Sequence, residues 1–299
     1  MERRADLHVH SFHSREQFGS GRWSLVFHPI LTPEEVYRRA KAAGMDFVTI
    51  TDHDTIDGCL ELLDRHPELE PEIILGEEVT SLYPGSGAEL HLSVLGHDER
   101  QHREIQRRRR DLLDLIGYLK SERIFYSLNH PIWDAAGRSW SLDRIRELLD
   151  LVRDTFPGIE TRNGSSFDHQ NRFASRLAEE FGKFVIGGSD SHTDQVGYTY
   201  TVAPGETKEE FLASIAAGRG RVEGGQLTAR YFRREARLLF VHNVRRRRKE
   251  AIGGLTERVA TAFVDYFQQR LSQLVAQLYL AAQRAVLQKG RWRGVDLWF

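Results

Sequence analysis

The chain has 299 residues, of which 40% are hydrophobic and 28% are charged, which is ordinary for a soluble protein with a large core. Its single cysteine, Cys59, excludes an internal disulfide framework and suits a reducing cytoplasm. No apolar segment follows residues 1–4, and no run of about 18 apolar residues occurs, so neither a signal peptide nor a membrane-spanning helix is expected. We therefore expect a cytoplasmic protein.

The small net charge of −1 hides two parts of opposite sign. Residues 223–299 hold 15 Lys and Arg against 6 Asp and Glu, whereas residues 1–222 hold 27 against 37. The composition changes near residues 220–225. We therefore expect an acidic body over residues 1–222 and a basic, mainly helical C-terminal extension over residues 223–299.

Short apolar runs alternate with helical patterns along the body. The first helix is expected to begin at the Thr32-Pro33 pair, a cap followed by proline at the first helical position, and to end near Gly44. The other helices are expected at 55–65, 99–121, 141–154, 168–181 and 207–217, and strands at 5–10, 47–51, 73–75, 90–95, 124–128, 158–161 and 184–186. This alternation predicts a mainly parallel α/β sheet, and the number of units indicates a barrel with its chemistry at the carboxyl ends of the strands.

Histidine and acidic residues follow almost every predicted strand. Asp190 and His192 come directly after the apolar run that ends in Gly187-Gly188, and His8 and His10 have the same spacing. In extended backbone, residues two apart point the same way, so each pair can bind one metal ion. The other strand-end residues are Asp6, Asp52, His53, Glu77, Glu78, His91 and His130. A single histidine of this kind is commonly structural, but the whole set indicates a metal centre.

The motifs in this order resemble the polymerase and histidinol phosphatase (PHP) family. The resemblance covers about residues 5–222 and rests on Asp6-x-His8-x-His10-Ser11, Thr51-Asp52-His53-Asp54-Thr55, Gly76-x-Glu78-Val79, His91, Asn129-His130-Pro131 and Gly188-Ser189-Asp190-Ser191-His192. It implies a distorted seven-stranded (β/α) TIM-like barrel that holds up to three divalent metal ions and hydrolyses phosphoesters.

The resemblance also implies a distribution of metal ligands. The first ion would be bound by His8, His10, Glu78 and Asp190; Glu78 would bridge to a second ion held by His91 and His130; a third would be held by His53, His192 and one ligand from the first loop. Imidazole and carboxylate ligands suit zinc, manganese or iron without a sharp choice among them.

The ligand from the first loop departs from the family pattern. Family members usually carry Ser-Asp where this chain has Ser14-Arg15, or a histidine one place further, where Glu16 stands. Glu16 is the candidate ligand; the alternative is an ordinary surface acid. His13 and His28, in the same segment, are less favoured alternatives. If none of these residues binds, the centre would hold two ions.

Metal ions that share a water lower its pKa from 15.7 towards roughly 7 and supply hydroxide at neutral pH. His53 or His192 could protonate the leaving group. Asp52 could orient His53, or it could cap the helix predicted at 55–65.

Substrate contacts are less clear in the sequence. Asn163 is a candidate because residues 160–166 resemble the family's strand-end segment with an asparagine near the substrate. Arg162 and Arg138 could bind a phosphate, although surface charges are the simpler interpretation.

The basic extension contains a run of arginines at 245–248 and a helical pattern of apolar residues from about 255 to 288. A helix that packs on the barrel or forms a homodimer through 255–288 is favoured, ahead of membrane-surface attachment and nucleic-acid binding.

The sequence thus predicts a metal-dependent phosphoesterase acting on a phosphorylated small molecule, a phosphate monoester or a nucleotide. The alternative is a non-catalytic or accessory metal-binding module whose basic helical tail binds a protein, a membrane or nucleic acid.

Overall fold

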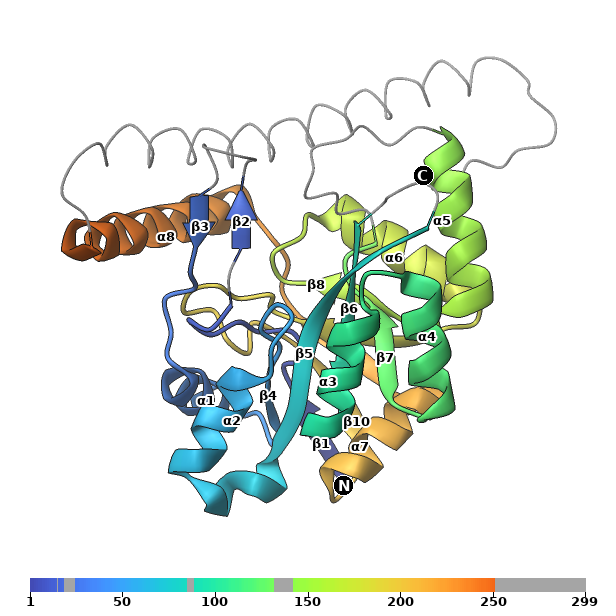
Figure 1. Ribbon diagram of the computed structural model, residues 1–299, viewed down its shortest axis with the longest axis horizontal. Helices are drawn as coiled ribbons and strands as arrows, with labels where there is room; N and C mark the ends of the chain where they lie inside the picture. The colour runs from blue at the N-terminus through green and yellow to red at the C-terminus, as the bar shows by residue number, and fades with distance from the viewer. Residues whose placement is uncertain (15, 19–24, 85–88, 132–141, 251–299) are drawn as a thin grey trace.

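The computed structural model describes residues 1–14, 16–18, 25–84, 89–131 and 142–250 (Figure 1). The strands are β1 (Glu2–Ala5), β2 (Glu16–Phe18), β3 (Leu25–Phe27), β4 (Val48–Ile50), β5 (Ile73–Leu82), β6 (Glu89–Leu95), β7 (Phe125–Leu128), β8 (Gly158–Asn163), β9 (Phe184–Gly188), β10 (Thr199–Pro204) and β11 (Arg221–Gly224). The helices are α1 (Pro33–Ala42), α2 (Asp57–Arg65), η2 (Pro67–Glu72), α3 (Glu99–Arg108), α4 (Leu112–Ser121), α5 (Leu142–Thr155), α6 (Asp168–Glu180), α7 (Lys208–Ser214), η3 (Ile215–Arg219) and α8 (Ala229–Glu250).

A curled six-stranded sheet forms the centre of this α/β fold, with the strand order β4-β5-β6-β7-β8-β9. Its neighbours pair in parallel except around β6, which runs antiparallel to both β5 and β7. The predicted mainly parallel sheet is therefore confirmed in part. The complete seven-stranded barrel is not confirmed.

The strand predicted at 5–10 divides in two. Residues 2–5 form β1, which pairs antiparallel with β10 in a separate three-stranded sheet with β11. The following residues lie between the two edges of the main sheet, because the Val9 carbonyl accepts from Thr51 N at 2.8 Å and the His8 carbonyl accepts from Asp190 N at 2.6 Å. The HxH motif is thus held between the ends of β4 and β9 without a regular ladder.

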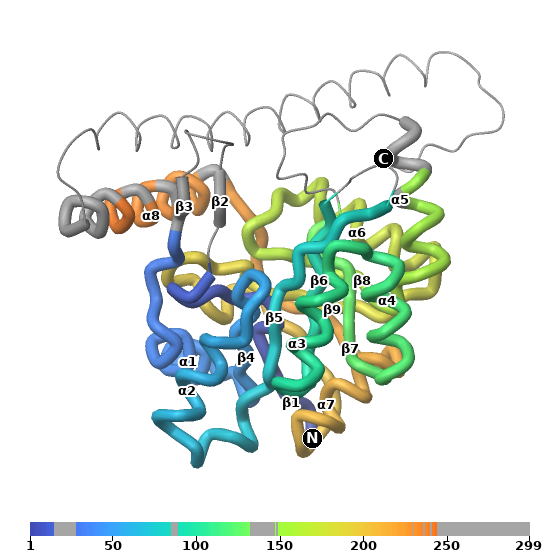
Figure 2. The backbone as a smooth tube through the Cα atoms, in the orientation of Figure 1, coloured from blue at the N-terminus to red at the C-terminus, as the bar shows by residue number. Residues whose placement is uncertain are grey.

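Helices cover the sheet on two sides of the molecule (Figure 1). Helices α1 and α2 pack beside β4 around Val36, Ile50 and Leu62, and helices α4, α5 and α6 pack beside β6 to β8 around Leu115 and Phe156. The backbone path in Figure 2 shows β1 and α7 close to the N-terminus. These apolar layers hold the strand ends in place.

Two predicted elements differ in detail. The helix predicted at 99–121 is two helices, because Asp111 accepts hydrogen bonds from Leu113 N and Asp114 N and so starts α4. Strand β5 extends seven residues beyond the predicted 73–75, so Glu78 lies inside the strand and not at its end.

The basic extension is described as far as residue 250. The arginines at 245–248 lie within α8, and the pattern at 255–288, with the homodimer predicted through it, lies outside the described residues. The boundary predicted at residue 222 falls inside β11. None of the described helices combines the length and apolar character needed to cross a membrane.

Candidate metal centre

Glu78 lies at the centre of a group of five imidazoles. Its Oε2 is 3.1 Å from His8 Nε2 and 3.3 Å from both His10 Nε2 and His53 Nδ1. Its Oε1 is 3.1 Å from His130 Nε2 and 3.4 Å from His91 Nδ1. The two oxygens of one buried carboxylate therefore face two different sets of histidines.

Asp190 completes the side of the site formed by the HxH motif. Its Oδ1 lies 3.4 Å from His10 Nε2 and 3.6 Å from His8 Nε2, and the two histidine Nε2 atoms are 3.2 Å apart. His192 reaches the same carboxylate, with Nδ1 at 3.5 Å from Oδ1, and its ring stacks on His10 at a centroid distance of 4.3 Å.

Polar partners orient the two inner imidazoles. His8 Nδ1 is 2.9 Å from Glu160 Oε1, and His10 Nδ1 is 3.1 Å from Ser14 Oγ. Because a carboxylate only accepts, the His8 proton is assigned to Nδ1, which leaves a lone pair on Nε2. A carboxylate behind a histidine is the usual support of a metal ligand.

Two asparagines hold the carboxylates in position. Asn129 Nδ2 donates to Glu78 Oε1 at 2.9 Å, and Asn163 Nδ2 donates to Glu160 Oε2 at 3.0 Å and to Asp190 Oδ2 at 3.1 Å. These amides fix the carboxylate planes.

The backbone at the site is unusual as well. His130 and Asp190 have φ angles of 23° and 49°, a left-handed region that side chains with a Cβ rarely adopt. Gly188 allows the HxH segment to approach closely, since a Cβ there would lie 2.4 Å from His8 N. Such strain is concentrated at functional sites.

The charges in the site depend on each other. Burial alone would raise the pKa of the Glu78 carboxyl, but the imidazoles of His8, His53 and His91 hold it well below its ordinary value. Burial alone would lower the pKa of His91, but the carboxylates of Glu78 and Glu89 raise it to about 10. Without cations, protons on the histidines thus balance the buried carboxylates.

These donors fit divalent metal ions. Ligands of one ion with bonds of 2.0–2.2 Å lie about 3.3 Å apart, close to the separations around His8 Nε2. Four overlapping groups have their ligand atoms within 4.8 Å of one another: His8, His10 and Asp190; His8, Glu78 and His130; His53, Glu78 and His91; His10, His53 and His192. Cations in such positions would replace the protons as partners of the carboxylates.

One side of the site is open to solvent. The side chains of His8 and His10 are fully buried, whereas those of His53, Asp190 and His192 are 13%, 16% and 17% exposed. A substrate would therefore meet His53 and His192 before the inner imidazoles.

The other predicted site residues have varied surroundings. Asp52 accepts from Ser11 N at 2.7 Å and from Ser11 Oγ at 2.6 Å, and burial raises its pKa to about 7. Arg162 donates to the Gly224 carbonyl at 2.9 Å and so links β8 to β11. Arg138 lies outside the described residues, and Glu16 lies in β2, whose side chains are not described. The roles of these residues stay predictions.

Two buried carboxylates position other residues of the site in a way that the sequence did not predict. Glu160 supports His8, and Asp6 accepts from Ser189 N at 2.8 Å and Ser189 Oγ at 2.6 Å. Asp6 fixes the loop that leads to Asp190. The local sign of Glu160 was a single acid inside strand β8.

Comparisons with known proteins agree with the fold and with the family resemblance. Residues 168–219 match the PHP_C family model, described as PHP-associated. A two-domain protein of Bacteroides vulgatus containing a predicted PHP-like metal-dependent phosphoesterase shares the fold, with a TM-score of 0.55 and 18% identity over 75% of this chain and 65% of that chain.

Two curated relatives match shorter stretches. An uncharacterized protein of Methanocaldococcus jannaschii is 36% identical over 78 residues, 25% of this chain and 43% of the relative. A 5'-3' exoribonuclease of Haemophilus influenzae is 31% identical over 99 residues, 33% of this chain and 31% of the relative. The chain thus spans less than half the length of either relative. The motif series gathered around Glu78, the PHP-associated segment and the shared fold all agree with the resemblance to the PHP family.

Proposed function

We propose that the protein is a metal-dependent hydrolase of phosphoesters. The observation that carries this proposal is the position of Glu78, whose Oε1 faces His91 and His130 while its Oε2 faces His8, His10 and His53. A carboxylate placed between two sets of imidazoles suits two neighbouring cations. We propose two or three ions of zinc, manganese or iron, the third depending on a ligand such as Glu16.

The bound ions would supply positive charge to the phosphoryl oxygens and activate a water at neutral pH. The chain's own residues would hold and orient the reacting groups. Glu160 and Ser14 keep the inner imidazoles in fixed orientations, and Asn163 holds Asp190 at 3.1 Å. Asn163 is therefore proposed first as a positioning residue.

The leaving group would receive its proton from a residue on the open side of the site. His53 and His192 are the partly exposed imidazoles there, and either would act as the general acid. Asp52 would act indirectly, because its recorded hydrogen bonds go to Ser11 in the loop that also carries His10 and Ser14.

The substrate proposed is a small phosphate monoester or a nucleotide. An acidic body over residues 1–222 disfavours a long polyanion. The local match to a 5'-3' exoribonuclease favours a second candidate, a 5'-phosphorylated oligoribonucleotide. Cytoplasmic location and a homodimer through 255–288 remain proposals.

A metal-supplemented screen tests both candidates. Purified protein is loaded with Zn²⁺, Mn²⁺ or Fe²⁺ and incubated with an aryl phosphate, an aryl phosphodiester, phosphorylated metabolites, mononucleotides and a 5'-phosphorylated oligoribonucleotide. We expect phosphate release from monoesters, and loss of activity and of at least two metal ions in Glu78→Ala.

The matched control is Glu68→Gln, which changes an exposed acid paired with His66 at 3.3 Å. This variant should keep both its metals and its activity. Hydrolysis of the oligoribonucleotide alone would favour the second candidate. Absence of turnover for every ester in fully metallated protein, or full activity of Glu78→Ala, would refute the proposal.

A further inference from the structure

A second cluster of histidine and carboxylate side chains lies on the opposite face of β5. Successive residues of a strand point to opposite faces, so Glu77 points away from the centre occupied by Glu78. Glu77 Oε1 is 3.1 Å from His97 Nε2 and 2.9 Å from His102 Nδ1. The ligand atoms of these three residues lie within 4.8 Å of one another.

His97 is the unusual member of this cluster. Its side chain is fully buried, yet neither ring nitrogen makes a hydrogen bond within the described residues. The contact of Nε2 with Glu77 is short but lacks hydrogen-bond geometry. Two ligands of one tetrahedral ion would lie about 3.3 Å apart, with each lone pair directed at the ion and not at the other ligand. The separation of 3.1 Å between Glu77 Oε1 and His97 Nε2 is that expected of two ligands of one ion.

Helix α3 supplies the third ligand and its support. His102 and Gln106 stand four residues apart on one face of α3, and Gln106 Nε2 donates to Glu77 Oε2 at 2.7 Å. This hydrogen bond fixes the carboxylate and leaves Oε1 directed at the two imidazoles. A hydrogen-bonded carboxylate of this kind is the usual form of a metal ligand.

The buried charge of Glu77 also calls for a cation. Within the described part of the chain, the ion pairs recorded for Glu77 are with His97 and His102. A buried charge is costly unless it is paired or binds a metal.

We propose that Glu77, His97 and His102 form a separate divalent metal site that connects β5 to α3. Two imidazoles and one carboxylate are a ligand set of zinc, which leaves a fourth position for water. His102 is 18% exposed and gives the ion a path from solvent. The inference does not depend on the phosphoesterase activity proposed above.

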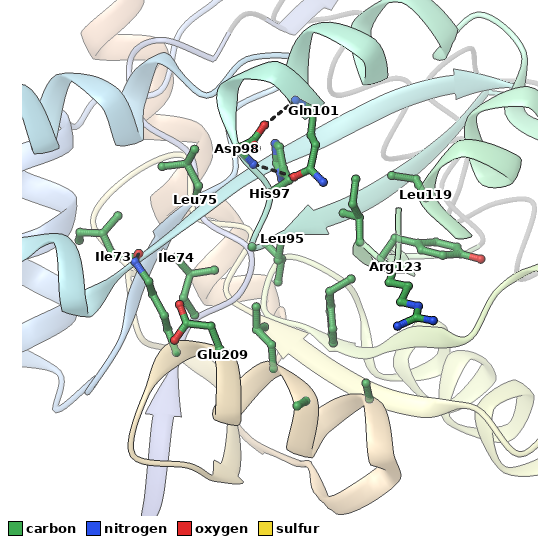
Figure 3. Close-up of a pocket in the computed structure, with 18 of the residues that line it drawn as sticks. Ile73, Ile74, Leu75, Leu95, His97, Asp98, Gln101, Leu119, Arg123 and Glu209 are labelled. Carbon is green, nitrogen blue, oxygen red and sulfur yellow. Dashed lines mark hydrogen bonds between the residues drawn. The ribbon is translucent and has the colours of Figure 1, made fainter. Parts of the chain in front are cut away.

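A cavity lies beside His97. His97 forms part of the wall of a cavity of about 910 Å³ between the start of β5, the end of β6 and α7. Figure 3 shows His97 beside Asp98 and Gln101, which cap α3 with a pair of hydrogen bonds of 2.7 and 3.0 Å. The start of α3 thus fixes the position of His97.

Zinc content per chain tests the site. The wild-type protein, His97→Asn and His102→Asn are loaded with zinc, dialysed, and measured by mass spectrometry, with circular dichroism to verify folding. We expect each variant to lose one equivalent of zinc, or to bind that equivalent at least about tenfold more weakly, while turnover of an aryl phosphate is unchanged. Cobalt substitution should show the same missing equivalent in its visible spectrum.

His66→Asn is the matched control, because it changes an exposed histidine that also contacts a carboxylate, that of Glu68. This variant should keep the wild-type zinc content. His102 is partly exposed, so His102→Asn decides the question if His97→Asn does not fold. Equal zinc content and affinity in the wild type and in folded His102→Asn would overturn the proposal.

Discussion

Replacement of Glu160 by glutamine tests how the metal centre is held, without a change in side-chain size. The Glu160 carboxylate accepts from His8 Nδ1 at 2.9 Å through Oε1, and from His130 N and Asn163 Nδ2 at 3.0 Å each through Oε2. A glutamine has one acceptor oxygen and one NH₂ donor, so it cannot accept from all three groups.

Either orientation of the glutamine amide weakens the site. If its oxygen faces His8, its NH₂ group meets the donors of His130 and Asn163, and two buried donors lose their acceptor. If its NH₂ group faces His8 Nδ1, the proton of His8 moves to Nε2, the atom that lies 3.1 Å from Glu78 and would bind the ion. A protonated nitrogen has no lone pair for a metal.

Loss of such a partner typically reduces metal affinity 10–100-fold, which corresponds to about 1.4–2.8 kcal/mol. Competition with a chromophoric chelator measures the dissociation constants, and thermal denaturation of metal-free protein separates affinity from folding. Glu68→Gln is the control, since Glu68 also contacts a histidine but is 68% exposed. Wild-type metal affinity in folded Glu160→Gln would refute the role assigned to Glu160.

Further outcomes concern protons, packing and the single thiol. The raised pKa of His91, about 10, places a proton on this imidazole at pH 7 in metal-free protein. Metal uptake should therefore release protons, and metal affinity should rise with pH. Calorimetric heats of metal binding that do not depend on the buffer would contradict this. Gly188→Ala should destabilise the fold by about 1–3 kcal/mol, because its Cβ would lie 2.4 Å from His8 N. Gly117→Ala, a control in α4 with no atom within 4 Å of the new Cβ, should stabilise it by about 0.5–1 kcal/mol; thermal denaturation compares the two. Burial raises the pKa of the Cys59 thiol to about 11. The native protein should therefore resist disulfide reagents at pH 8 and react faster as the pH rises towards 11. Rapid stoichiometric labelling of native protein at pH 8 would contradict this.

The regular elements of the body were largely predictable because each has a local cause. Thr32 is the N-cap of helix α1 and accepts a hydrogen bond from Glu35 N, and proline follows at the first helical position, as the sequence indicated. The additional strands β10 and β11 depend on pairing between distant segments, such as Thr201 with Val222, which no local pattern reveals. The break between α3 and α4 is a capping event at Asp111 inside one continuous helical pattern.

The same distinction applies to the site. Spacings of two residues predicted the pairs His8 with His10 and Asp190 with His192, because alternation along extended backbone is a local property. The support of His8 by Glu160 joins residues 152 positions apart and could not be read from either segment. The second cluster was missed for a related reason, since Glu77 was grouped with Glu78 although the two side chains of one strand face opposite sides of the sheet.

The net charge places helix α8 with the basic extension, whereas its contacts place it with the body. The sign of the net charge changes near residue 222, yet α8 packs against the body beside the metal centre. Glu235 accepts a hydrogen bond from Thr193, the residue after His192, and Arg234 pairs with Asp194 at 2.6 Å. Asn243 accepts from His28 N at 3.2 Å, which ties the helix to the chain segment after the first loop. The segment from 229 to 243 therefore supports the open side of the site, and removal of residues beyond 222 would disturb the loop of His192 together with the basic tail.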